Sequence, residues 1–376
     1  DAQESRGLGD VYKRQILTFN NILGGFMTTL TFIGAGMMAS ALAVPAYDNG
    51  HEIRIVGTHL DDEIVKRAKE DGYHLNMKRQ LPDGFKWYYY DELEEGLDGA
   101  DAVICGVSSF GVDWFLEEIY PKLDPKLPVL SVTKGMINKE DGSLLSYPEY
   151  WEEELAKKGI KRDICAVGGP CTSYELADKH HSLVGFCGTN IDDLKFFRDT
   201  FANDYYHVSI SKDVRAVELS VALKNAYALA VSLAVGIAET EEGKEGVNHY
   251  NPQAALFAQS TREMGDLLEL VNGDKNQLEL GVGDLYVTIF GGRTRRIGTL
   301  LGRGYSYEKA MEELAGVTLE SVVIAKRMGE AITVLADKGE VKKDKFPLLM
   351  HIYNMIANGA KLNIPWNKFN QEDLDN

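Results

Sequence analysis

The sequence contains few cysteines and no cluster of side chains suited to hold a metal ion. Four cysteines (Cys105, Cys165, Cys171 and Cys187) occur among 376 residues, and no two of them form a CxxC pair. The eight histidines are scattered along the chain. Reduced thiols are therefore the simplest interpretation of the cysteines, and no metal site is expected.

An excess of positive charge is also missing. The chain has 40 Lys and Arg against 57 Asp and Glu, which gives a formal net charge of −17 at pH 7. A nucleic-acid partner requires a basic face that displaces counterions, so this composition excludes such a partner. It is typical of a cytoplasmic protein, in which a local basic pocket can still bind a small anion.

No apolar run is long enough to span a membrane. The longest, residues 226–238, follows Lys224 and Asn225 directly and is predicted to be a buried core helix. Residues 1–26 lack an apolar stretch followed by a small-residue cleavage site, so a signal peptide is not expected. We interpret residues 1–26 as a non-native, disordered leader, with Met27 as the true start.

The chain after Met27 divides into two predicted domains. Residues 27–210 alternate short apolar runs with segments of helical or loop character, which predicts a Rossmann-like, doubly wound, mainly parallel α/β sheet. The expected strands are residues 30–33, 52–56, 86–90, 102–105, 129–132, 164–167, 183–187 and 205–209. Residues 211–376 show helical periodicity and are expected to form an all-α domain, with helices at 214–240, 252–271, 295–301, 307–314, 318–338 and 346–358.

A dinucleotide fingerprint follows the first predicted strand. Gly34-x-Gly36-x-x-Ala39 stands between a strand and a helix, where Gly34 permits a tight turn and Gly36 permits close approach of a diphosphate. Ala39 leaves room for the helix to pack on the sheet. The alternative is a glycine turn in a βαβ unit that binds no phosphate.

The choice between NAD and NADP depends on the end of the second strand. No arginine stands there to bind a 2′-phosphate, and Asp61 and Asp62 follow shortly after it. This pattern favours NAD and leaves NADP open.

Lysines and small residues lie where further chemistry is expected. Lys134 follows one predicted strand, and Gly168-Gly169-Pro170 follows another, at the edge where open sheets bind ligands. Lys224 and Asn225 interrupt an otherwise apolar helix. Lys224 is either a solvated lysine at the helix edge or a partly buried lysine whose lowered pKa allows proton exchange near neutral pH.

Residues 281–296 combine an acid, a hydroxyl and three arginines around two glycines. Asp284 and Thr288 precede Gly291-Gly292, and Arg293, Arg295 and Arg296 follow. Guanidinium groups beside flexible glycines suit a phosphate. The alternative is a solvated basic turn after a strand-like run.

Taken in order, these segments resemble the NAD(P)-dependent glycerol-3-phosphate dehydrogenases. The matching series is GAGMMA (34–39), TKG (133–135), GGP (168–170), LKN (223–225), GDLYVT (283–288) and GGRTRR (291–296). The resemblance implies reversible hydride transfer between dihydroxyacetone phosphate and sn-glycerol 3-phosphate. It also implies a Rossmann domain, a helical domain and a homodimer.

The resemblance also implies roles for individual residues. Lys224 would be the general acid and base, Lys134 would stabilise the substrate oxygen, and Asp284 would hold and tune Lys224. The remaining substrate contacts are expected from Gly169, Cys171, Asn225, Thr288, Arg293 and Thr294. Cofactor contacts are expected from Gly34, Gly36, Met37, Met38, Ala39, Thr58, Phe110, Lys134, Arg293 and Glu320.

Three positions depart from the family's pattern. Thr294 stands where the family usually has asparagine, residues 106–110 read Gly-Val-Ser-Ser-Phe where it usually has a proline, and Cys171 replaces a residue that is often small and polar. Two other functions therefore stay open. One is a related dehydrogenase of another small phosphorylated or acidic hydroxy compound, and the other is a non-catalytic dinucleotide-binding sensor.

Overall fold

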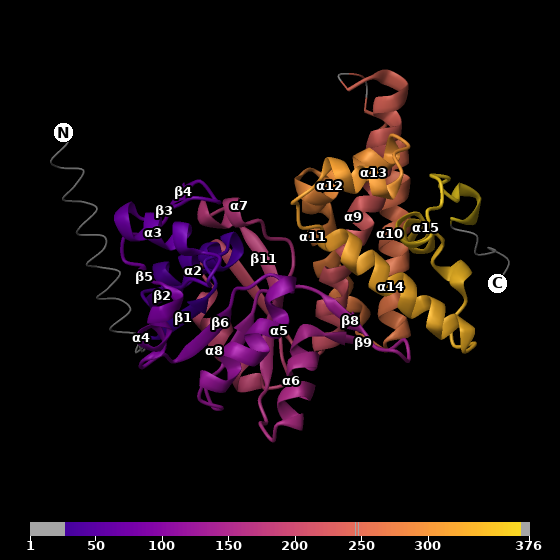
Figure 1. The fold of residues 1–376 in the computed structure, drawn as a ribbon. Helices are drawn as coiled ribbons and strands as arrows, with labels where there is room; N and C mark the ends of the chain where they lie inside the picture. Colours follow the sequence, from indigo (N-terminus) through magenta and orange to yellow (C-terminus); the bar gives the residue numbers. More distant parts are fainter. Residues whose placement is uncertain (1–26, 245, 247, 370–376) are drawn as a thin grey trace.

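A computed structural model describes residues 27–244, 246 and 248–369 of the chain. The leader predicted for residues 1–26 lies outside the described residues. The structure has an α/β part, which holds the first half of the chain, and a helical part beside it (Figure 1). This confirms the predicted fold class, an N-terminal Rossmann-like sheet followed by a helical C-terminal region.

A single large sheet organises the α/β part. Within the described residues its strand order is β12-β11-β10-β7-β6-β1-β2-β5, and every neighbouring pair is parallel except β10 and β11. The predicted mainly parallel, doubly wound sheet is confirmed. Its strands are β1 (Thr29–Ile33), β2 (Glu52–Val56), β5 (Lys86–Tyr88), β6 (Ala102–Cys105), β7 (Val129–Ser131), β10 (Ile164–Gly168), β11 (Ser182–Cys187) and β12 (Tyr206–Ser211).

Helices cover both faces of this sheet because its strands alternate apolar side chains between the two faces. On β1, Leu30 and Phe32 belong to one core and Ile33 to the other. The first core is closed by α2 (Met37–Asp48), α3 (Asp62–Asp71), α7 (Ser173–Ala177) and α8 (Ile191–Phe201). The second is closed by α4 (Leu93–Leu97), α5 (Val112–Trp114) and α6 (Tyr147–Lys157).

The helical part is built around α9 (Val214–Glu242), which packs against most of the other helices of this part. The others are α10 (Tyr250–Leu270), α11 (Leu278–Ile289), α12 (Gly292–Gly302), α13 (Tyr307–Glu313), α14 (Glu320–Asp337) and α15 (Pro347–Ala357). Helix α12 packs closely on α9 through glycines: a Cβ added at Gly302 would lie 2.1 Å from the carbonyl oxygen of Leu233. This close crossing fixes the C-terminal half of α12 against α9.

Helix α9 is also long and apolar enough to cross a membrane by length and composition. Of its most apolar 18-residue window, 83% is buried inside the protein. The segment predicted as a buried core helix, residues 226–238, lies within α9 and is buried along nearly all its length.

Residues 278–289 form a helix that the sequence did not lead us to expect. The run Leu-Tyr-Val-Thr-Ile has strand-like composition, yet it forms the last five residues of α11. Leu280, Gly281, Asp284 and Leu285 are its buried residues, and their spacing presents one helical face to α9. The interpretation of this run as a strand-like segment before a basic turn is therefore wrong.

A small hairpin, β8 (Met136–Asn138) and β9 (Leu144–Ser146), leaves the α/β part directly after Lys134. It packs on α14 of the helical part: the Arg327 guanidinium donates to the carbonyl of Met136 at 2.7 Å. A second short hairpin, β3 (Tyr73–His74) and β4 (Arg79–Gln80), lies beyond α3.

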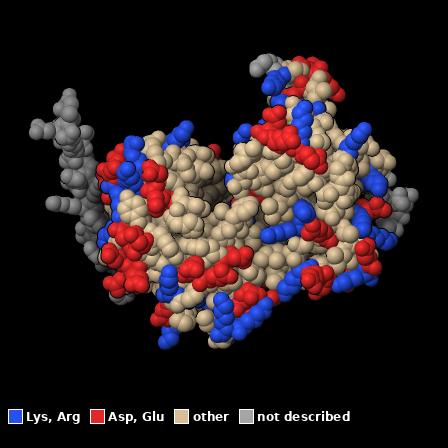
Figure 2. Space-filling view, in the orientation of Figure 1, with Lys and Arg blue, Asp and Glu red and all other residues tan. Residues whose placement is uncertain are grey.

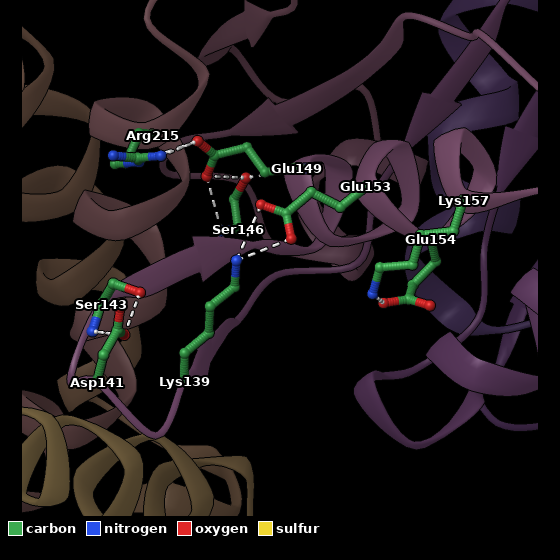
Figure 3. Close-up of polar contacts among 9 residues, drawn as sticks. All are labelled: Lys139, Asp141, Ser143, Ser146, Glu149, Glu153, Glu154, Lys157 and Arg215. Carbon is green, nitrogen blue, oxygen red and sulfur yellow. Dashed lines mark hydrogen bonds and ion pairs between the residues drawn. The ribbon is translucent and has the colours of Figure 1, made fainter. Parts of the chain in front are cut away.

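The end of the β8–β9 hairpin is tied to the first turn of α9. Ser146 caps α6, with Glu149 closing a capping box, and the Arg215 guanidinium donates to Glu149 at 2.6 Å (Figure 3). Lys139 binds Glu153 of α6 at 2.8 Å in the same region. Contacts on both sides of the hairpin therefore hold the loop that carries Lys134 against the helical part.

Candidate active site

One buried carboxylate joins the two lysines that the sequence singled out. Asp284 Oδ2 accepts a hydrogen bond from Lys134 Nζ at 2.7 Å, and Asp284 Oδ1 accepts one from Lys224 Nζ at 2.6 Å. Lys134 comes from the α/β part, whereas Lys224 and Asp284 come from α9 and α11 of the helical part. The cluster therefore lies at the junction of the two parts.

The cluster is nearly enclosed, so its charges act in a medium of low polarity. The side chain of Asp284 is 1% exposed, that of Lys134 17% and that of Lys224 14%. Burial, followed by the like charge of Lys134, lowers the pKa of Lys224, although Asp284 opposes the shift. Burial alone would also lower the pKa of Lys134, but the charge and hydrogen bond of Asp284 outweigh it and raise the pKa.

Backbone geometry positions Lys134. Thr133 donates its hydroxyl hydrogen to the carbonyl oxygen of Val107 at 2.7 Å, which anchors the loop after β7 to the loop after β6. The next residue, Gly135, packs so closely against the Tyr147 ring that an added Cβ would lie 2.5 Å from it. The lysine is thus held at the carboxyl edge of the sheet, as predicted.

Gly169 lies beside Lys134. The Lys134 ammonium donates to the Gly169 carbonyl oxygen at 3.3 Å. Gly169 has a φ of +130°, which favours glycine, and an added Cβ would lie 3.0 Å from the Val184 backbone. Cys171 is half-buried close to the same lysine, and burial raises the pKa of its thiol to about 11. The thiol is therefore neutral at physiological pH.

Thr288 and Asn225 stand next to the cluster along their helices. Thr288 lies one turn beyond Asp284 on α11 and donates its hydroxyl hydrogen to the Asp284 carbonyl oxygen at 2.6 Å. Asn225 follows Lys224 on α9 and is half-buried. Both residues therefore lie next to members of the lysine cluster along the chain.

The fingerprint turn has the shape that a dinucleotide diphosphate requires. Gly34 has a φ of +104°, and a Cβ added there would lie 3.0 Å from the Gly106 backbone. Gly36 is the N-cap of α2 and provides no side-chain cap, so the backbone N–H groups of the first helical turn face outward. A Cβ added at Gly106 would lie 2.4 Å from that of Ala39, which explains why both positions are small. The residues present therefore fit the cofactor.

Asp61 stabilises the turn that follows β2. Its Oδ2 accepts hydrogen bonds from Thr58 N and Thr58 Oγ1, both at 2.8 Å, and from Ala35 N at 3.2 Å. The carboxylate thus links the end of β2 to the fingerprint. Thr58, one of the expected cofactor contacts, is held in place by this link.

Phe110 and Glu320 lie on segments that meet across the junction. Ser109 donates its hydroxyl hydrogen to Glu320 Oε1 at 3.3 Å, which joins the loop after β6 to the start of α14. Phe110, the residue that follows Ser109, is 64% exposed. Met37 and Met38, in the first turn of α2, are half-buried.

Among the described residues, no hydrogen bond or ion pair joins Arg293 or Thr294 to the lysine cluster. They begin α12, where Arg293 lines a cavity of about 620 Å³ together with Arg295, Arg296 and Arg303. Arg295 is partly engaged, because it donates to the Ile289 carbonyl oxygen at 2.6 Å and closes the turn between α11 and α12. The structure therefore separates an arginine-rich pocket from the acid–base cluster.

The face drawn in Figure 2 shows a notch between the two parts whose walls are mainly uncharged residues, while most of the charged residues in this view lie on the outer surfaces. No group of three or more metal-binding side chains is found within the described part of the chain.

One buried acid in this region was not assigned from the sequence. Glu218 of α9 is 0% exposed, and neither of its carboxylate oxygens has a hydrogen-bond partner among the described residues. The sequence did carry a signal for this buried acid, because Glu218 stands between Val217 and Leu219 in a largely apolar helix.

Comparisons with known proteins agree with this arrangement. The family model described as NAD-dependent glycerol-3-phosphate dehydrogenase N-terminus matches residues 29–191, and the corresponding C-terminus model matches residues 213–366. A relative from Archaeoglobus fulgidus, named NADP(+)-dependent glycerol-3-phosphate dehydrogenase, is 32% identical over 338 residues, which cover 89% of this chain and 96% of the relative.

Solved structures show the same fold. A glycerol-3-phosphate dehydrogenase from Coxiella burnetii superposes with a TM-score of 0.72 at 22% identity, covering 92% of this chain and 98% of its own. One from Plasmodium falciparum has a TM-score of 0.75 at 18% identity, covering 95% of this chain and 99% of its own. At these identities the likeness establishes the fold alone.

Proposed function

The chain belongs to the NAD-dependent glycerol-3-phosphate dehydrogenase family, and we propose that Lys134, Lys224 and Asp284 form its reaction centre. It is an NAD(P)-dependent oxidoreductase acting on a CH–OH group, and it interconverts dihydroxyacetone phosphate and sn-glycerol 3-phosphate. The observation that supports the proposed centre is the single carboxylate shared by two buried lysines from different parts of the fold.

The reduction requires a hydride and a proton. When bound, the reduced nicotinamide supplies the hydride to the carbonyl carbon of the substrate. Lys224 donates the proton to the oxygen that becomes the hydroxyl, since its lowered pKa makes proton release easier. In the reverse direction the neutral Lys224 amine accepts that hydroxyl proton.

Lys134 keeps its charge and stabilises the negative charge that develops on the same oxygen. Its raised pKa suits this electrostatic role, and a preorganised cation in an enclosed site needs little rearrangement during the reaction. Asp284 holds both ammonium groups in place. Asn225 and Thr288 complete the polar surface, and Gly169 and Cys171 border it.

The remaining residues bind the two ligands. Gly34, Gly36 and Ala39 cradle the diphosphate, with Met37, Met38, Thr58, Phe110 and Glu320 as further cofactor contacts. Arg293, beside Thr294, binds the substrate phosphate and contacts the cofactor. For Arg293 to do both, the N-terminus of α12 must face the bound substrate, so we expect the two parts to approach each other when the ligands bind.

The resemblance supports two further proposals. The protein acts as a homodimer, which sedimentation velocity at assay concentrations tests. It is located in the cytoplasm, which fractionation of the native cells tests.

The proposed function is tested by following the nicotinamide absorbance with NADH and NADPH in turn. Dihydroxyacetone phosphate should be reduced, and unphosphorylated dihydroxyacetone should react far more slowly. Equal rates on both compounds would contradict phosphate recognition and favour a related dehydrogenase. Cofactor binding without turnover on either compound would favour a non-catalytic sensor.

A further inference from the structure

A buried histidine from a distant part of the chain binds the carbonyl oxygen of Ala35, inside the fingerprint turn. His74 Nε2 lies 2.9 Å from this oxygen, and both residues are 0% exposed. His74 ends β3 of the β3–β4 hairpin, 39 residues beyond Ala35. No other hydrogen bond to the Ala35 carbonyl is found within residues 27–244, 246 and 248–369. His74 is therefore the group that holds this carbonyl in place.

The two hydrogen bonds of the His74 ring fix which nitrogen carries the proton. The backbone N–H of Met77 donates to His74 Nδ1 at 3.1 Å, so Nδ1 is an unprotonated acceptor. The Ala35 carbonyl can only accept, so Nε2 carries the hydrogen and donates it. Burial lowers the pKa of His74, which keeps the ring neutral at physiological pH. The neutral imidazole thus links the hairpin to the fingerprint turn.

The hairpin holds the imidazole in a fixed position. The N–H of Lys78 donates to the carbonyl oxygen of His74 at 2.7 Å, and Lys78 has a φ of +54°, so the chain reverses tightly beyond the histidine. The His74 ring also packs on Trp87 of β5, with 6.5 Å between the ring centroids. The donor to Ala35 is therefore held by both its own backbone and the neighbouring strand.

Holding the Ala35 carbonyl toward the interior turns the next backbone N–H outward. In a trans peptide the C=O and N–H groups point in opposite directions, and the described residues contain no cis peptide bond. The N–H in the same peptide as the Ala35 carbonyl is that of Gly36, the N-cap of α2, and it has no hydrogen-bond partner in the described part of the chain. This N–H therefore points away from His74, at the helix start where a diphosphate is expected.

We propose that His74 is a positioning residue for the cofactor: its Nε2–H holds the Ala35 carbonyl and thereby aims the Gly36 N–H at the diphosphate of the nicotinamide dinucleotide. This inference rests on the proposed binding of that diphosphate at the fingerprint turn. His74 acts through the backbone of the turn and does not touch the cofactor.

Asp61 holds the same turn at a different peptide and cannot replace His74. Its carboxylate accepts from the N–H of Ala35 at 3.2 Å, and this N–H belongs to the peptide between Gly34 and Ala35. An ionised carboxylate only accepts hydrogen bonds, so it cannot hold a carbonyl oxygen. The orientation of the following peptide, which carries the Gly36 N–H, therefore depends on His74.

Two substitutions separate the two hydrogen bonds of the ring. In His74→Gln the amide nitrogen can take the place of Nε2 and donate to Ala35. In His74→Asn the amide oxygen can take the place of Nδ1 and accept from Met77, but the shorter side chain does not reach Ala35. The first variant keeps the bond to the fingerprint turn, and the second keeps only the bond within the hairpin.

The test is the dissociation constant of NADH and of NADPH, measured by isothermal titration calorimetry at a temperature where every variant is folded. His74→Asn should weaken binding about tenfold for each reduced cofactor that the wild type binds, whereas His74→Gln should stay within about threefold of the wild type. In His74→Asn the KM for the cofactor should rise in parallel, while kcat at saturating cofactor stays within about twofold, because the lysine cluster is untouched.

His51→Asn is the matched control. Nδ1 of the half-buried His51 also accepts a backbone N–H, that of Thr28 at 3.2 Å, but this contact lies at the amino ends of β1 and β2, away from the fingerprint. Its cofactor affinity should equal that of the wild type.

Unchanged cofactor affinity in His74→Asn, or equal weakening in His74→Asn and His74→Gln, would overturn the positioning role and leave the proposed function standing. The nitrogen resonances of the His74 ring in the wild-type protein give a second test that requires no variant. They should show a neutral ring protonated at Nε2, and a ring protonated at Nδ1 would also overturn the proposal. A wild type that binds neither reduced cofactor would overturn both the positioning role and the proposed function.

Discussion

Replacing Asp284 with asparagine removes the charge that holds the two lysines and keeps the shape of the side chain. Asp284 is 0% exposed and bonds Lys134 and Lys224 at 2.7 and 2.6 Å, so the variant leaves two buried ammonium groups near one neutral amide. Removing one partner of a buried ion pair costs about 3–5 kcal/mol. We expect Asp284→Asn to lower the free energy of unfolding by an amount in this range at neutral pH.

The loss should depend on pH in a defined direction. Without Asp284, burial and mutual repulsion lower the pKa of both lysines below their values in the unfolded chain. A lysine with a lowered folded pKa destabilises the protein most at low pH, where it must be charged, and this penalty shrinks as the pH rises above the folded pKa. The difference between variant and wild type should therefore decrease from neutral to alkaline pH.

Urea unfolding at several pH values measures the stability, and the nicotinamide assay measures the rate, which should fall by about 10²–10⁴-fold because the acid is no longer tuned. Asp71→Asn is the matched control: Asp71 pairs with Arg67 at 2.7 Å on the surface, and its loss should change neither quantity measurably. An Asp284→Asn variant with wild-type stability and rate would refute the account of the cluster.

Three further changes have defined outcomes. With the reduced cofactor kept saturating for each variant, Arg293→Ala should raise KM for dihydroxyacetone phosphate about 10–100-fold and leave the slow rate with unphosphorylated dihydroxyacetone unchanged, and a parallel loss on both under these conditions would contradict phosphate binding. Burial raises the pKa of Glu263 to about 7 from its ordinary value of 4.5, so this group's stabilising contribution is full below about pH 4.5 and is lost as the pH rises through about 7. Glu263→Gln should remove this fall of up to about 3 kcal/mol, as seen in unfolding curves across that interval. Gly302→Ala should destabilise by about 1–3 kcal/mol because its Cβ would lie 2.1 Å from α9, whereas Gly265→Ala in α10, with its nearest atom at 3.5 Å, should be neutral or slightly stabilising; equal effects in thermal unfolding would contradict the packing.

Local patterns were sufficient to predict most of the fold. The fingerprint, the apolar runs of the sheet and the long periodic helices α9, α10, α14 and α15 each carry their signal within a short segment. Helix α11 was missed because Leu-Tyr-Val-Thr-Ile has strand-like composition, and only contact with α9 makes it helical. The β8–β9 hairpin was missed because its strands are only three residues long.

The candidate site was predicted in part. Motif order brought Lys134, Lys224 and Asp284 together as a hypothesis, and the structure confirms that they are in contact. The sequence did not predict that one carboxylate bridges both lysines. This contact depends on how α9, α11 and the loop after β7 are placed relative to one another. The same limit hid the full burial of Glu218, whose carboxylate oxygens have no hydrogen-bond partner among the described residues.

The account centres on Lys224 as the group that transfers the proton. Its most direct test is the turnover of Lys224→Met with dihydroxyacetone phosphate, measured together with the dissociation constant of the reduced cofactor. The variant keeps the length of the side chain and removes the proton donor, so the rate should fall by at least about 10²-fold while cofactor binding stays within about threefold. A variant that retains turnover within about tenfold of the wild type would contradict the assignment of Lys224 as the acid.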